Sequence, residues 1–148
     1  MAYDAESDRV ILFGGITEGD NDETWAYDFN TNTWTNMEPA ARPTPRHSHA
    51  LAYDAESDRV VLFGGHQFAV HSDETWAYDF NTNTWTKMEP TTQPLKLAAH
   101  SLAYDAESDR VVLFGGDDSD SFIHSNEIWA YDLNANTWTD LSPVQESQ

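Results

Sequence analysis

The chain has 148 residues, a formal net charge of −19 from 26 acidic and 7 basic side chains, and no cysteine. Such a composition argues against nucleic acid and anionic membrane surfaces as partners, because binding to phosphates needs clustered Lys and Arg. It also excludes disulfides and thiolate metal sites. No leader segment and no apolar run of about eighteen residues is present, so we expect a soluble chain without a membrane partner and, by default, an intracellular one.

One unit of about fifty residues occurs three times. The block Ala-Tyr-Asp-Ala-Glu-Ser-Asp-Arg-Val begins at Ala2, Ala52 and Ala103. A second block, Trp-Ala-Tyr-Asp, begins at Trp25, Trp76 and Trp129. A repeat of this length indicates stacked or radial units that bury their apolar faces against each other. We therefore treat residues 1–148 as one repeat domain.

In the middle unit, residues 49–53 alternate, with His49, Leu51 and Tyr53 on one face, which predicts a first strand. Residues 54–58 are polar and turn-forming. Residues 59–63 form a continuous β-branched and aromatic run, as expected for a second strand that is buried on both faces. The glycine pair that follows indicates a turn or a close approach of two backbones.

Residues 75–80 alternate large aromatic with smaller side chains and predict a third strand. Asn-rich turn residues follow, and residues 84–88 predict a fourth strand that ends before Pro90. Four short strands with short connections form an antiparallel meander, and repeated meanders give an all-β propeller. A β-solenoid is the competing architecture, but solenoid coils are shorter and less aromatic.

At this point the residues resemble the kelch repeat, in which a glycine pair is followed by a tyrosine and then a tryptophan. The matching positions are Gly14, Gly15, Tyr27, Trp34; Gly64, Gly65, Tyr78, Trp85; and Gly115, Gly116, Tyr131, Trp138. Arg46 and His49 resemble the Arg and His that often open the repeat. The tryptophans that recur at fixed places, Trp34 among them, are expected to be core or blade-interface anchors. The resemblance implies a kelch-like β-propeller with blades at about 1–39, 46–90 and 97–143. It implies little about function, because kelch propellers include binding proteins and several enzymes.

Three blades are fewer than the six or seven that kelch propellers usually have. An open arc would leave two apolar blade faces in water, which predicts association. We therefore expect two chains to form a six-bladed homodimer. The near-identity of the copies leaves two alternatives open, a fragment of a longer propeller and a recently amplified or engineered chain whose only property is assembly.

In a meander, the connections between second and third strands share one rim with the connections between blades. These segments differ among the copies, whereas the turns of the opposite rim are nearly constant. Loops on a rigid scaffold usually carry binding, although unconstrained loops also drift. The residues predicted to contact a protein or small ligand at this rim are Arg42, Arg46, His66, Phe68, His71, Asp117, Asp118 and Phe122. Either arginine could hold a carboxylate or phosphate, or pair with the abundant acids.

Metal sites are weaker candidates. Asp117, Asp118 and Asp120 are closely spaced, as are Glu18, Asp20 and Asp22, but neither run has the glycine and terminal glutamate of a calcium loop. Both runs are therefore interpreted as solvated acidic loops rather than calcium sites. His66 and His71 could meet a transition metal together with His124 or a carboxylate. The repeated His49 and His100 are interpreted as packed structural groups.

The repeated Asp-Ala-Glu-Ser-Asp-Arg stretch is interpreted as a turn with a surface ion pair, because an enzyme normally has one site and not three. No nucleophilic triad, phosphate loop or cofactor fingerprint is present. We therefore predict a non-catalytic binding module without a cofactor. The alternative is a metal-dependent lyase or isomerase, as some kelch-like proteins are; the Cys–Tyr copper chemistry of others is excluded by the lack of cysteine.

Overall fold

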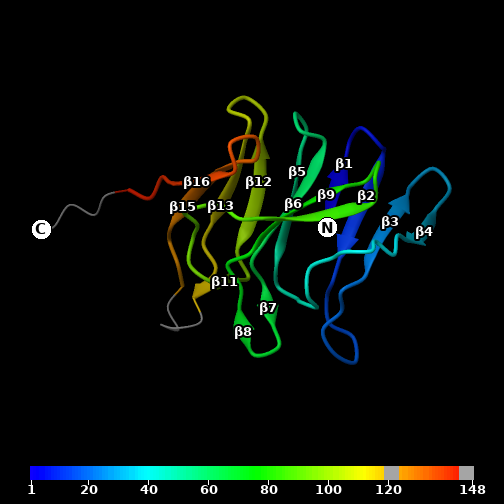
Figure 1. Cartoon of the computed structure of the whole chain (residues 1–148), viewed down its shortest axis with the longest axis horizontal. Helices are drawn as coiled ribbons and strands as arrows, with labels where there is room; N and C mark the ends of the chain where they lie inside the picture. Colours follow the sequence, from blue (N-terminus) through cyan, green and yellow to red (C-terminus); the bar gives the residue numbers. More distant parts are fainter. Residues whose placement is uncertain (119–123, 144–148) are drawn as a thin grey trace, which may run out of the picture.

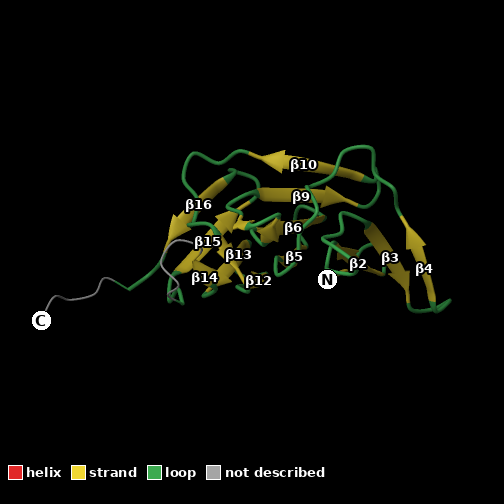
Figure 2. Ribbon diagram, turned by 90° about the horizontal axis from the view of Figure 1, so that it is seen from below, coloured by secondary structure: helices red, strands yellow, loops and turns green. Residues whose placement is uncertain are grey.

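A computed structural model describes residues 1–118 and 124–143. Within these residues, three four-stranded antiparallel sheets lie in a row, each packed against the next (Figure 1). Turned by 90°, Figure 2 shows β4 (Thr33–Asn36) of the first sheet at one end of the row and β16 (Thr137–Asp140) of the third at the other. No helix in the described ranges has the length and apolar character needed to cross a membrane.

The chain completes the strands of one large sheet before it begins those of the next. We call the three large sheets blades 1, 2 and 3. Blade 1 contains β1 (Ala2–Asp4), β2 (Arg9–Phe13), β3 (Thr24–Asp28) and β4 (Thr33–Asn36). Blade 2 contains β5 (Ala50–Asp54), β6 (Arg59–Phe63), β9 (Thr75–Asp79) and β10 (Thr84–Met88). Blade 3 contains β12 (Ser101–Asp105), β13 (Arg110–Phe114), β15 (Ile128–Asp132) and β16 (Thr137–Asp140).

Two small ladders complete the described strands. β7 (His66–Gln67) pairs with β8 (Val70–His71), and β11 (Leu97–Ala98) pairs with β14 (Asp117–Asp118). Two of the strand ranges predicted for the middle unit, 59–63 and 84–88, are confirmed. The first begins and ends one residue later than expected and the third ends one residue earlier, at Asp79.

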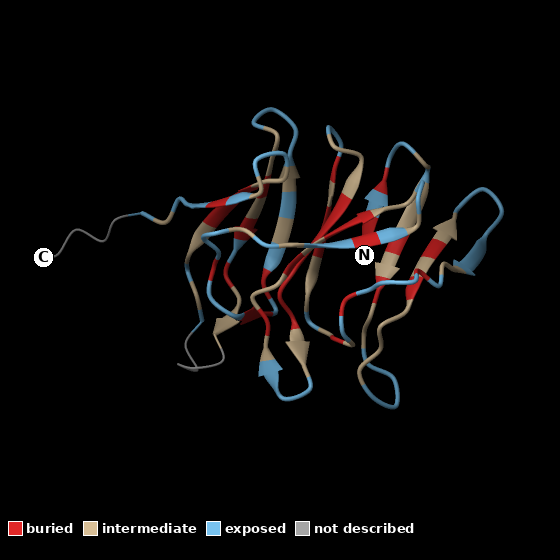
Figure 3. Cartoon of the chain, viewed as in Figure 1, coloured by how far each residue is buried: buried red, intermediate tan, exposed pale blue. Residues whose placement is uncertain are grey.

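The hydrophobic core is divided into two clusters, one at each junction between blades (Figure 3). β6 contributes to both, because its side chains alternate in direction. Val60 and Leu62 pack into the cluster shared with blade 1, while Val61 and Phe63 pack into the cluster shared with blade 3. The continuous apolar run of this strand is thus explained by burial on two faces, as predicted.

One aromatic contact recurs at both junctions. Phe13 of blade 1 meets Trp85 of blade 2 with ring centroids 5.2 Å apart, and the Trp85 indole Nε1 donates to Thr24 Oγ1 over 2.9 Å. At the next junction, Phe63 meets Trp138 at 5.1 Å, and Trp138 donates to Thr75 in the same way over 3.0 Å. Edge-on aromatic pairs with a satisfied indole N–H stabilise beyond the area they bury.

The end blades lack this contact on their outer faces. Trp34 was expected to anchor a blade interface, but it is 48% exposed, because no described blade lies beyond blade 1 on that side. At the other end Phe114, the counterpart of Phe13 and Phe63, is 56% exposed. Each end of the row therefore presents one half of a contact that the interior of the chain makes twice.

The repeated acidic stretch has the structural role that we predicted. In blade 2, the Asp54 carboxylate accepts hydrogen bonds from the backbone N–H groups of Glu56 and Ser57 and so closes the turn between β5 and β6. Arg59 then pairs with Asp79 across β6 and β9 at 2.9 Å. Equivalent ion pairs occur in the other two blades.

The first glycine of a pair allows two backbones to approach at a blade junction. Gly64 has a φ of +67°, and a Cβ placed on it would lie 2.5 Å from the carbonyl oxygen of Leu97 in the next connection. Gly115 has a similar φ of +72°, but its closest neighbour would be 3.6 Å away, at the Ser125 carbonyl. An alanine would be strained by the positive φ at both positions, but only at Gly64 would its Cβ clash with a neighbouring backbone.

We predict that Gly64→Ala destabilises the fold much more than Gly115→Ala. Both variants incur about 1–2 kcal/mol for a side chain in the left-handed region, but only Gly64→Ala must also displace the Leu97 backbone. Urea unfolding followed by tryptophan fluorescence measures the difference. Equal losses for the two variants would show that the junction is not tightly packed at Gly64.

His49 and His100 are structural, as expected. The ring of His100 packs on Phe63, and its Nε2 lies 3.0 Å from the Phe63 carbonyl oxygen. Burial lowers the pKa of His100 to about 4, although the hydrogen bond to Phe63 acts in the opposite direction. Burial, followed by the nearby charge of Arg46, lowers the pKa of His49 to about 3. Both histidines are therefore neutral in the folded protein at pH 7.

These low pKa values predict a loss of stability in mild acid. Between pH 6.5 and 4 the unfolded chain binds a proton at His100 and the folded chain does not, so the free energy of unfolding falls as the pH decreases. The contribution of His100 is on the order of 3 kcal/mol. His100→Gln should therefore show a smaller fall over this range in unfolding experiments. An unchanged fall would contradict a buried, neutral His100.

Candidate functional site

The segments that differ among the copies lie together along one edge of the molecule. We define the variable rim as the loops 16–21, 66–72, 117–118 and 124–125 with the blade-connecting segments 40–47 and 91–98. In Figure 1 the loops between second and third strands lie at the lower edge, whereas the constant turns between first and second strands lie at the upper edge. The fold thus places sequence variation on one rim, as the meander predicts.

Backbone hydrogen bonds tie each connecting segment to the loops on both sides of a junction. His47 and His66 exchange two such bonds, of 3.1 and 2.7 Å, and the Arg46 N–H donates to the Asn21 carbonyl over 3.2 Å. At the next junction, the Leu97 N–H donates to the Ser72 carbonyl over 3.2 Å. The rim is therefore a continuous, hydrogen-bonded surface rather than a set of separate loops.

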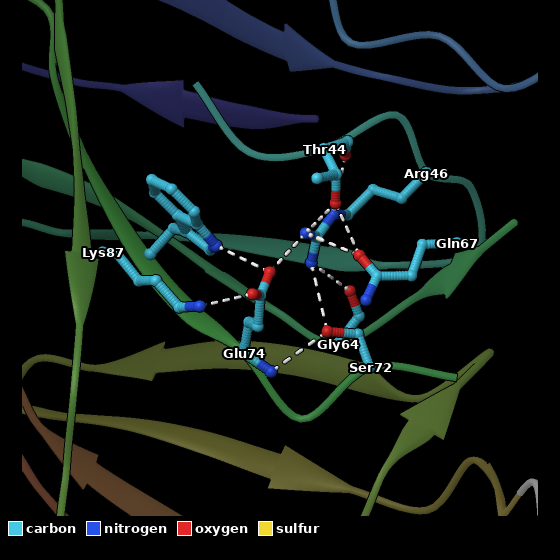
Figure 4. Close-up of polar contacts among 8 residues, drawn as sticks. Thr44, Arg46, Gly64, Gln67, Ser72, Glu74 and Lys87 are labelled. Carbon is cyan, nitrogen blue, oxygen red and sulfur yellow. Dashed lines mark hydrogen bonds and ion pairs between the residues drawn. The ribbon is translucent and has the colours of Figure 1, made fainter. Parts of the chain in front are cut away.

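Arg46 lies beneath this surface and is fully buried. Figure 4 shows its polar contacts. Its guanidinium group donates to the Gly64 carbonyl over 3.1 Å, to Gln67 Oε1 over 3.1 Å and to Glu74 Oε2 over 2.6 Å. Further bonds go to Thr44 and Ser72. The prediction that Arg46 contacts a ligand is corrected here: all its donors are used within the protein, and it holds the loops of the rim in place.

Glu74 is the acidic partner of this network. It also accepts hydrogen bonds from Lys87 Nζ over 2.6 Å and from the Trp76 indole over 3.1 Å. Burial alone would raise the pKa of Glu74, but the hydrogen bonds from Lys87, Arg46 and Trp76 outweigh it and lower the pKa to about 2. The carboxylate is therefore charged and engaged, and is poorly suited to proton transfer.

The second predicted arginine, Arg42, stays at the surface. It pairs with Asp22 at 3.1 Å, and both side chains remain partly exposed. This pair lies on the blade 1 side of the rim, away from the residues of the blade 3 side. Asp20, from the same acidic run, lies 2.7 Å from His47 Nδ1.

The rim contains a cavity of about 430 Å³ on its blade 2 and blade 3 side. Its walls come from β8, the β7–β8 turn and the loop that follows β13. The lining residues are His66, Ala69, Val70, His71, Asp117, Asp118 and His124. The structure therefore brings together four of the predicted rim residues. His124, which the sequence analysis grouped with His66 and His71, lines the same cavity and bonds Asp117. Phe122 and Asp120, also predicted, lie outside the described residues.

Phe68 lies at the tip of the β7–β8 hairpin and is 77% exposed. It is one of four large apolar side chains that the rim presents to solvent, the others being Ile16, Val70 and Leu95. Single exposed apolar residues are ordinary, whereas larger groups of them on one surface are a general feature of interfaces between proteins.

Sequence reasoning missed one grouping at this rim. Among the described residues, potential metal-ligating atoms converge within 4.8 Å of one another at Asp20, His47 and His66. His47 was not singled out, although the copies differ there: the equivalent position in the next connecting segment is Ala98. This difference between the copies is the signal in the sequence that could have identified His47.

Comparison with known families adds one finding. The whole chain, residues 1–148, matches the family model described as the KLHDC2/KLHL20/DRC7 Kelch-repeats domain. The match agrees with the observed four-stranded antiparallel sheets.

We predict that Arg46→Leu lowers the free energy of unfolding by about 2–4 kcal/mol, because it leaves buried acceptors without a donor. Leucine is a fair test, since Leu97 occupies the equivalent position at the next junction and is buried. The control is Arg42→Leu, which removes only the surface pair with Asp22 and should change stability little. Similar losses in chemical unfolding would contradict the structural role of Arg46.

Proposed function

The chain belongs to the kelch-repeat family of β-propeller proteins, and from this we propose that it is a non-catalytic scaffold that binds a protein partner through its variable rim. The observation that carries the proposal is the segregation of sequence variation. The copies agree in their packed blades and at one rim, and differ at the rim that contains the cavity. Binding surfaces on repeat scaffolds are built in this way.

The chemistry of the rim favours a protein over a small anionic ligand. The exposed apolar residues Phe68 and Val70 lie beside a cavity walled by Asp117 and Asp118. With the net charge of −19, this surface suits a partner that presents an apolar side chain next to Lys or Arg. Arg42 is the rim's exposed cation on the blade 1 side, and it is paired with Asp22.

We also propose that the scaffold is completed by a second copy of the chain. The exposed Phe114 of one copy would receive the exposed Trp34 of the other, which is the contact that Phe13 and Trp85 make within the chain. Phe29 supports this view: it is exposed, while its counterparts Phe80 and Leu133 pack against the core clusters that their blades share with the preceding blades. Two chains joined at both ends would form a six-bladed ring with two-fold symmetry.

The binding proposal is tested by capture of partners with the intact chain, followed by titration of the purified partner. Phe68→Ser should weaken that partner's binding at least about tenfold, because it removes an exposed apolar anchor. The control is Glu107→Gln, an exposed residue on the opposite, constant rim. The proposal is contradicted if the partner binds Phe68→Ser as tightly as the unmodified chain but no longer binds Glu107→Gln. That result would show that the partner binds the constant rim and not the variable rim.

The assembly proposal is tested by exchanging one apolar residue at a time. Trp34→Ser should give a folded monomer in light scattering, because it removes half of each seam between the two chains. Phe68→Ser, which removes a more exposed apolar residue from the rim, should leave the assembly intact. If both variants keep the mass of the unmodified chain, or both lower it equally, Trp34 does not form the seam.

A further inference from the structure

Asp20, His47 and His66 come from three different segments and meet at the junction of blades 1 and 2. Asp20 closes the loop between β2 and β3 through a bridge with Ile16, His47 lies in the connecting segment, and His66 begins β7. Each residue offers one ligand atom, and the three atoms lie within 4.8 Å of one another. The grouping therefore depends on the fold and not on a local sequence motif.

The backbone holds the two histidines in place. His47 and His66 exchange two backbone hydrogen bonds, which fixes their side chains next to each other with ring centroids 4.9 Å apart. The Asp20 carboxylate lies 2.7 Å from His47 Nδ1. All three side chains are half-buried. Little backbone rearrangement is needed for the three groups to face a common ion.

The ring of His66 has an unused polar atom. Its Nδ1 is shielded from solvent and has no hydrogen-bond partner among the described residues. A buried ring nitrogen without a partner is costly, and a ligand or ion can satisfy it. The hydrogen bonds of Arg46 immediately below the rim keep the surrounding loops ordered.

From this geometry we propose that the rim contains a site for a divalent first-row transition ion, best suited to Zn²⁺, with Asp20, His47 and His66 as its ligands. Imidazole nitrogens favour such ions over Ca²⁺ and Mg²⁺, which prefer oxygen. Three protein ligands at about 2.0–2.2 Å leave one tetrahedral position for water or a side chain of a rim-bound partner. Ligand atoms around such an ion are about 3.3 Å apart, so side-chain rotations of an ångström or so complete the site.

The repeat supplies an internal comparison. At the junction of blades 2 and 3, the equivalent positions are occupied by His71, Ala98 and Asp117: Ala98 pairs with Asp117 as His47 pairs with His66. The second junction therefore has no ligand in its connecting segment. Alanine at this position is compatible with the fold, which makes His47→Ala a substitution the scaffold already accommodates.

The test is a calorimetric titration of the full chain, stripped of metal with a chelator, with Zn²⁺ alone. We expect one Zn²⁺ per chain, and binding that is weakened at least about tenfold in His47→Ala. His124→Ala removes an exposed imidazole from the neighbouring cavity and should leave the affinity unchanged. Bound Co²⁺ should show the intense visible bands of a tetrahedral site, and these should be lost in His47→Ala.

The absence of stoichiometric Zn²⁺ binding to the unmodified chain would overturn the proposal. So would binding that survives His47→Ala, which would point to scattered carboxylates, or binding that is lost in His124→Ala, which would point to the cavity. Unchanged melting temperatures of the metal-free variants show that the fold is intact. Partner binding through Phe68 can fail or succeed without altering this result, because the titration contains no protein partner.

Discussion

The fold depends on the edge-on contact between a phenylalanine of one blade and a tryptophan of the next. Phe13 and Trp85 make it at the first junction, and Phe63 and Trp138 at the second. In both cases the indole N–H is satisfied by a threonine of the preceding blade, so that the largest side chain of the repeat is buried without an orphaned donor. A single blade cannot bury these rings, which is why the repeat exists only in a row.

This constraint separates the parts of the molecule that must stay constant from those that are free to differ. The blade strands carry the contact and are nearly identical among the copies, while the connecting segments only have to span from one blade to the next. Arg46 and Leu97 show this freedom: they occupy equivalent buried positions, one within a hydrogen-bonded network and the other within an apolar cluster. The rim can therefore change its chemistry without changing the blades, and that is the property our proposed binding role uses.

Much of the fold was predictable, because the two-residue alternation of side chains along each strand and the internal repeat both indicate which residues are buried. The two-sided burial of β6 followed from its continuous apolar run. The turn role of the acidic stretch and the structural role of His100 followed from their recurrence among the copies. The site was less predictable, because it depends on segments distant in sequence. Nothing in the composition shows that Arg46 is buried, or that His47 lies beside Asp20, until the connecting segment has been placed. The sequence also predicted that Trp34 anchors a blade interface, but no described blade of the same chain packs against it.

The central claim of this account is that the two open ends of the row are halves of one contact. Its most direct test is sedimentation of the unmodified chain over a dilution series at micromolar concentrations. The account predicts a discrete species of twice the chain mass of 16.7 kDa, with tryptophan fluorescence that changes only when that species dissociates. A compact species of single-chain mass at all concentrations, with Trp34 and Phe114 left in water, would contradict it.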